Sequence, residues 1–148
     1  MIAQTFIELY TSKIENLKKE ISLYPSDEAV WETAPGIINS GGTLCLHLIG
    51  NIKHFIGAVL GSSGYIRDRD KEFSERNVLR QKLIQELDEA ILIINQTFHD
   101  KDDAYFMQEY PTQKFLQNKD INFALVFFLT HFDYHLGQVN YLRRITSV

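Results

Sequence analysis

Two histidines four residues apart, His131 and His135, are the residues in this sequence best suited to metal chemistry. On a helix, residues at positions i and i+4 leave the same face, so both imidazoles would point the same way. The same face carries Ala124, Leu142 and Ile145, which predicts that it is buried in the core. Burying two imidazoles is unfavourable unless their nitrogens are satisfied, and a divalent metal satisfies one nitrogen of each at about 2.0–2.1 Å.

A third histidine, His47, lies on a second predicted helix, between the apolar residues Leu44 and Leu48. Helices that face each other in a bundle bring such residues together in the core, so we expect His47 to meet the HxxxH pair. Three imidazole ligands leave one or more metal positions open to water or substrate, which is typical of catalytic rather than structural sites. Because HxxxH also arises by chance, histidines that only make hydrogen bonds are the alternative.

Polar residues one helical turn from the histidines could support such a site. Asn51 follows His47 by four residues, and Gln138 follows His135 by three. Either side chain could orient a ligand's other ring nitrogen or hydrogen-bond a substrate, and a hydrogen bond between the two helices is the alternative. His54 lies almost on the same stripe as His47 and could line the mouth of the site or support a ligand.

Arg67 and Arg69 follow the second predicted helix in a strongly charged segment. Their guanidinium groups could clamp a carboxylate of a substrate or of a thiol cofactor. Acidic residues surround them at positions 68, 70, 72 and 75. A solvated, salt-bridged loop is therefore the alternative interpretation of this segment.

A divalent metal held by three neutral imidazoles keeps its full positive charge. It would lower the pKa of bound water to about 7 or deprotonate a bound thiol, and either event gives a nucleophile at neutral pH. This chemistry suits the transfer of a small thiol to an electrophile, and it suits hydrolysis equally. Cys45 stands two residues before His47 and therefore points away from the ligands, so we expect it to be a buried packing residue.

Four stretches with the helical spacing of apolar residues would position these side chains. Pro25 ends the first stretch, and a glycine-serine run that begins at Gly61 ends the second. The stretches cover residues 2–24, 40–60, 75–98 and 121–145. Residues 100–120 form either two short strands or one irregular crossing. Four helices of about twenty residues predict an all-α four-helix bundle that forms a single domain, residues 1–148.

Composition narrows the class of protein further. Of the 148 residues, 45% are apolar and 23% are charged, which excludes a disordered or low-complexity chain. The net charge of −4 argues against a nucleic-acid binder, which usually carries a basic face. One cysteine cannot form an internal disulfide, and this predicts a reducing, cytoplasmic location. The longest apolar stretch, residues 121–129, is too short to span a bilayer, and Glu8 and Glu15 argue against a signal peptide.

Two histidine-containing segments resemble the DinB-like superfamily, also described as damage-inducible or YfiT-like proteins. Residues 39–51, with His54 after them, resemble the metal-ligand helix of that superfamily. Residues 131–140 resemble its last helix, in which HxxxH is followed by Gly-Gln. The charged loop 65–73 is similar to a segment in one branch of it. Together with the order of the helices, the resemblance covers nearly the whole chain.

The resemblance implies an up-down-down-up four-helix bundle and a zinc or nickel ion held by His47, His131 and His135. It also implies a frequent homodimer. Characterised members include thiol-dependent transferases and isomerases that use bacillithiol, mycothiol or glutathione, so a small thiol and a small-molecule substrate are the expected partners. Asp133 and Tyr134 depart from the small or apolar residues usual there, but position 133 should point away from the metal.

Three hypotheses about function follow from these patterns. The leading hypothesis is a metal-dependent enzyme of the thiol S-transferase type, with hydrolysis as a variant of the same chemistry. The second is a bundle that binds a metal without catalysis and acts in stress response or through partners. The third is a purely structural bundle that binds no metal. An open coordination position beside a cavity favours the enzyme, whereas a fourth protein ligand favours the non-catalytic binder.

Overall fold

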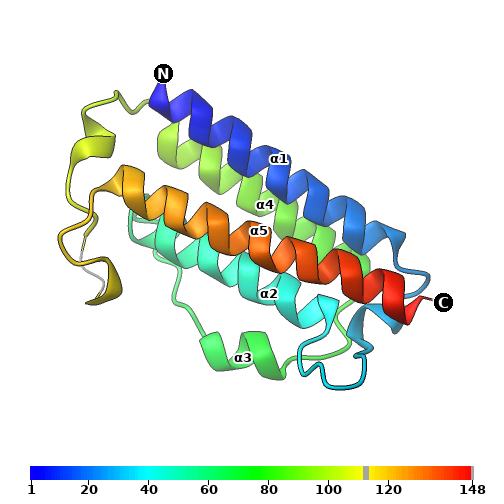
Figure 1. Ribbon diagram of the computed structural model, residues 1–148. Helices are drawn as coiled ribbons and strands as arrows, with labels where there is room; N and C mark the ends of the chain where they lie inside the picture. The colour runs from blue at the N-terminus through cyan, green and yellow to red at the C-terminus, as the bar shows by residue number, and fades with distance from the viewer. Residues whose placement is uncertain (112–113, 148) are drawn as a thin grey trace.

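Four long helices and one short helix make up the fold of the computed structural model, which describes residues 1–111 and 114–147 (Figure 1). The long helices are α1 (Ile2–Leu23), α2 (Gly41–Asn51), α4 (Arg80–Phe98) and α5 (Ile121–Thr146). The short helix α3 (Arg69–Ser74) lies beside α2, outside the bundle. Helix α2 continues directly into a π-helical segment, Ile52–Ala58. The all-α prediction is confirmed, and the described residues form no strand.

Each long helix buries one stripe of apolar residues in a shared core. Ile14, Leu17 and Ile21 of α1 and Leu83 and Leu87 of α4 have no exposed surface. Steps of three or four residues place such side chains on one face of a helix. Helix α1 packs against α4 and α5, while α2 packs against α5 and its π-helical continuation packs against α4. The chain runs in one direction through α1 and α5 and in the opposite direction through α2 and α4 (Figure 1).

The region before α4 differs from the prediction of one helix over residues 75–98. Residues 69–74 form the separate helix α3. Glu75 then takes an extended backbone conformation, and Asn77 has a left-handed φ of 64°. A right-handed helix cannot pass through a left-handed residue, so α4 begins only at Arg80.

The connection between α4 and α5 is irregular, which is one of the two alternatives predicted for residues 100–120. It contains 3₁₀ turns at Tyr105–Met107 and Lys114–Leu116 and an isolated bridge between Glu109 and Asp120. The Asp120 side chain then accepts a hydrogen bond of 2.7 Å from a backbone N–H in the first turn of α5. This N-cap fixes the start of the helix that carries His131 and His135.

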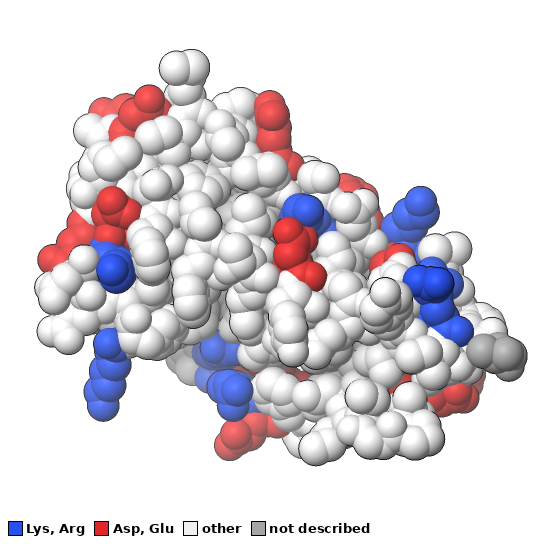
Figure 2. All heavy atoms as spheres, in the orientation of Figure 1, with Lys and Arg blue, Asp and Glu red and all other residues white. Residues whose placement is uncertain are grey.

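Charged side chains of both signs are scattered over the face of the molecule shown in Figure 2. Uncharged surface separates them over much of this view, in which α5 and α2 lie in front (Figure 1). This face therefore offers no continuous basic surface of the kind that binds a nucleic-acid backbone. Among the described helices, none combines the length and the apolar character needed to cross a lipid bilayer.

Candidate metal centre

The structure brings three imidazoles together, His47 from α2 and His131 and His135 from α5. The Nε2 atom of His131 lies 3.4 Å from Nε2 of His47 and 3.1 Å from Nε2 of His135. One ligand atom from each residue lies within 4.8 Å of the others. Ligands at about 2.0–2.1 Å from zinc stand about 3.3–3.4 Å apart in a tetrahedron, so the measured separations suit coordination of one ion.

The cluster is closed on the α2 side and accessible on the α5 side. His47 is 7% exposed, whereas His131 and His135 are half-buried. Burial is the main cause that lowers the pKa of both α5 histidines. The two neighbouring histidines and Arg67 lower the pKa of His131 further, to about 4. Both residues are therefore neutral at pH 7, which is the form of imidazole that binds a metal.

Hydrogen bonds that Nδ1 donates orient two of the three rings. His47 Nδ1 donates to Oε1 of Glu72 at 3.2 Å, and His135 Nδ1 donates to Oε1 of Gln138 at 2.7 Å. A neutral imidazole whose Nδ1 carries the hydrogen has a free lone pair on Nε2. Both lone pairs are therefore available at the centre of the cluster, and outer partners of this kind commonly orient metal-binding histidines.

Asn51 connects the third imidazole to Arg67. Its Nδ2 donates to His131 Nδ1 at 3.2 Å, and its Oδ1 accepts from Arg67 Nη2 at 2.8 Å. In this arrangement the hydrogen of His131 lies on Nε2, between the two free lone pairs. Coordination through Nε2 requires that hydrogen on Nδ1, with the Asn51 carbonyl turned to accept it. The donor set therefore fits a divalent cation once this amide has turned, a change that also gives up the hydrogen bond from Arg67 Nη2 to Asn51.

Glu72 of α3 is a candidate functional residue that the sequence patterns do not single out. Its side chain is 7% exposed, and Arg67 donates to it from Nε to Oε2 and from Nη2 to Oε1, both at 2.8 Å. Burial raises the pKa of the Glu72 carboxyl, but hydrogen bonds from Arg67 and His47 outweigh burial and hold the pKa below its ordinary value. A carboxylate therefore lies behind His47, on the side of the ring away from the other histidines.

Three other candidate residues from the sequence, Arg67, Arg69 and His54, do not belong to the histidine cluster. Arg67 forms the predicted salt bridge, but its side chain is only 13% exposed, so the pair is buried rather than solvated. Arg69 is exposed, and its guanidinium lies 4.9 Å from the ring centroid of Phe73. His54 lies in the π-helical segment, where the wider turn rotates side chains away from the α-helical register. Its buried Nδ1 makes no hydrogen bond with any described residue.

Acidification is expected to destabilise the metal-free protein. An unfolded chain protonates its histidines near pH 6.5, whereas burial, the two neighbouring histidines and Arg67 keep folded His131 neutral down to about pH 4. Between these values the unfolded state binds more protons, so the free energy of unfolding falls as the pH falls. Urea unfolding with a chelator at several pH values in this window measures the slope. His131→Phe should make the slope shallower, and an unchanged slope would contradict the assignment.

Comparison with known proteins places this chain in a sequence family. Neither a curated protein nor a solved structure matches the chain at a significant level. A family model described as a protein of unknown function, DUF1572, matches residues 2–147, which include all three clustered histidines. Because this match extends over nearly the whole sequence, the chain belongs to the DUF1572 family.

Proposed function

We propose that the protein is a metal-dependent enzyme of the DinB-like superfamily that transfers a small thiol to an electrophile. The observation that carries the proposal is the convergence of three Nε2 atoms in a cluster whose α5 side is accessible. DUF1572 is a DinB-like family. The helix directions in Figure 1 also fit the up-down-down-up order of that superfamily.

The number of protein ligands supports an enzyme over a non-catalytic binder. Among the described residues, the group that could hold a metal ion contains the three histidines and no carboxylate or thiol. A zinc or nickel ion at this place would supply a Lewis acid that keeps a coordinated thiol as thiolate at neutral pH. Glu72 and Gln138 hold the rings of His47 and His135, so these two ligands are oriented before an ion arrives.

An apolar cavity next to the cluster could receive the body of the electrophile. It has a volume of about 450 Å³ and is lined by Gln138 together with Ile37, Tyr141 and Ile145, among others. Gln138 joins the cavity to the cluster because it accepts the hydrogen bond from His135. Ile145, which the spacing predicts to be buried, is 58% exposed because it lines this open cavity near the end of α5.

Metal content and turnover measured on one preparation test the proposal. The protein would be purified without a polyhistidine tag or a nickel column, and its metal content determined. The zinc- or nickel-loaded protein would then be mixed with glutathione, bacillithiol or mycothiol and with chlorodinitrobenzene as the electrophile. We expect turnover that requires both the thiol and the metal. Metal binding without turnover of any thiol would favour the non-catalytic binder, and product release without a thiol would favour hydrolysis.

A further inference from the structure

Residues 62–77, which we call the strap, leave the bundle after α2 and return to it before α4 (Figure 1). The strap contains α3, and left-handed backbone marks its two ends, with φ of 50° at Ser62 and 64° at Asn77. Glu72 is the one strap residue that is buried. The attachment of the strap to the bundle therefore depends on few side chains.

Glu72 attaches the strap to a predicted metal ligand. Its Oε1 lies 3.2 Å from Nδ1 of His47, and the ring centroid of the adjacent Phe73 lies 4.9 Å from that of His47. Arg67, also in the strap, holds both oxygens of the carboxylate. Gly50 of α2 leaves room for the contact between Glu72 and His47, because a Cβ on residue 50 would overlap the Glu72 carboxylate.

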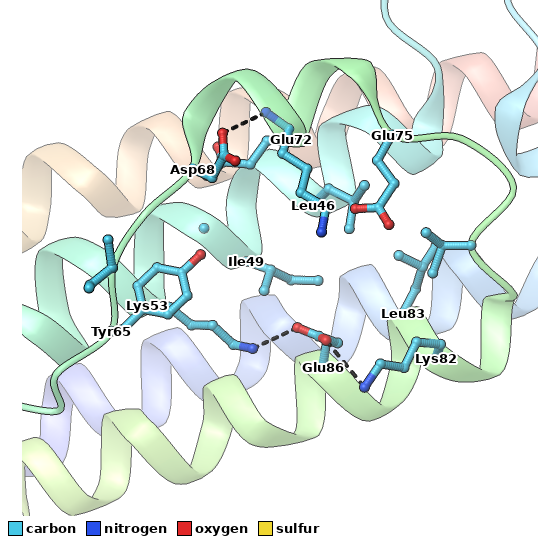
Figure 3. A pocket seen from close by; sticks show the side chains of 14 residues that line it. Leu46, Ile49, Lys53, Tyr65, Asp68, Glu72, Glu75, Lys82, Leu83 and Glu86 are labelled. Atoms are coloured by element: carbon cyan, nitrogen blue, oxygen red, sulfur yellow. Dashed lines mark hydrogen bonds and ion pairs between the residues drawn. The ribbon is translucent and has the colours of Figure 1, made fainter.

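A cavity on the other side of Glu72 separates part of the strap from the bundle (Figure 3). Its volume is about 370 Å³, and α2, the strap and α4 line it. Lys53 and Lys82 both form ion pairs with Glu86 of α4, at 2.6 and 3.3 Å, so neither of these cations forms its ion pair with an acidic residue of the strap. The polar contacts of Glu72 and Arg67 are therefore a main link between strap and bundle.

We propose that Glu72 is a positioning residue for the metal, acting through His47, and that strap docking and metal binding form one coupled equilibrium. The inference rests on the metal centre of the proposed function but not on the proposed reaction. Coordination polarises an imidazole and strengthens its remaining N–H as a donor, so an ion should tighten the Glu72–His47 hydrogen bond. Because coupling is reciprocal, docking of the strap raises the affinity for the metal by the same factor by which the metal favours docking.

Zinc affinity measured by competition with a chromophoric chelator tests the positioning role. We expect Glu72→Ala to weaken zinc binding about 10- to 100-fold, the range typical of outer partners of metal ligands. Glu72→Gln keeps an oxygen that accepts from His47, so its loss should be smaller. Glu75→Gln is the matched control, because it removes the same charge at the end of α3 from a side chain that lines the cavity instead. Thermal unfolding verifies that each variant is folded.

Trypsin cleavage tests the coupling. The strap contains four trypsin sites, Arg67, Arg69, Lys71 and Arg76. Zinc should slow cleavage at these sites in the wild-type protein and in Glu75→Gln, but not in Glu72→Ala. Wild-type cleavage that zinc leaves unchanged, or wild-type zinc affinity in Glu72→Ala, would overturn the proposal. If the wild-type protein bound no zinc, the proposed metal centre would be overturned as well. If both tests gave the expected results but no thiol were turned over, only the proposed reaction would be refuted.

Discussion

Replacing His131 with alanine is expected to weaken zinc binding at least about 100-fold. The Nε2 atom of His131 is the one that both other histidines approach, at 3.4 Å and 3.1 Å. Structural zinc sites bind with about 10–16 kcal/mol, which is roughly 3 kcal/mol for each ligand. A tenfold change in affinity corresponds to about 1.4 kcal/mol, so the loss of one ligand removes at least two powers of ten. Chelator competition and the zinc content after dialysis measure the effect.

Two histidines outside the cluster provide controls for this substitution. His99 is exposed at the end of α4, and its Nδ1 donates to the backbone carbonyl of Asn95. His54 is half-buried on the continuation of α2 but is not part of the cluster. We expect His99→Ala and His54→Ala to keep wild-type zinc affinity. If His131→Ala also kept its zinc, the ligand assignment would be wrong.

The long helices could be predicted because each carries a regular stripe of apolar residues. The first prediction, residues 2–24, extends one residue beyond α1, and the last, residues 121–145, stops one residue short of α5. Helix α3 could not be predicted, because six mostly charged residues carry no helical stripe. Its separation from α4 depends on the left-handed backbone of Asn77, which composition and spacing do not show.

The clustered histidines could be predicted from spacing, because an i, i+4 pair and a facing residue must share the core. Asn51 and Gln138 lie one turn from those histidines, so regular helix geometry also brings them within reach. Glu72 could not be distinguished from the acids around it, since only its packing against His47 and Gly50 sets it apart. Four features stay predictions: which metal binds, which thiol is used, whether the protein forms a homodimer, and whether it is cytoplasmic.

Replacing Gly50 with alanine is expected to weaken zinc binding about 10-fold or more. A Cβ on residue 50 would overlap the Glu72 carboxylate, which Arg67 and His47 hold in place. The carboxylate ends a flexible side chain, so the smallest adjustment is for Glu72 to leave His47. Displacing the carboxylate from His47 costs folding stability, and the preference for alanine over glycine inside a helix offsets only up to about 1 kcal/mol of that cost. Chelator competition and urea unfolding measure the two properties separately.

The steric route from residue 50 through Glu72 to His47 can be isolated with two further variants. Gly137→Ala adds the same methyl group to α5, where a Cβ meets no atom within 4 Å, so zinc affinity should stay at the wild-type value. In a Glu72→Ala background the overlapping carboxylate is gone, so Gly50→Ala should bring no further loss. The two substitutions act on one contact and are therefore expected to be strongly non-additive. Losses that simply add in the double variant would contradict this route, because residue 50 would then act on the metal independently of Glu72.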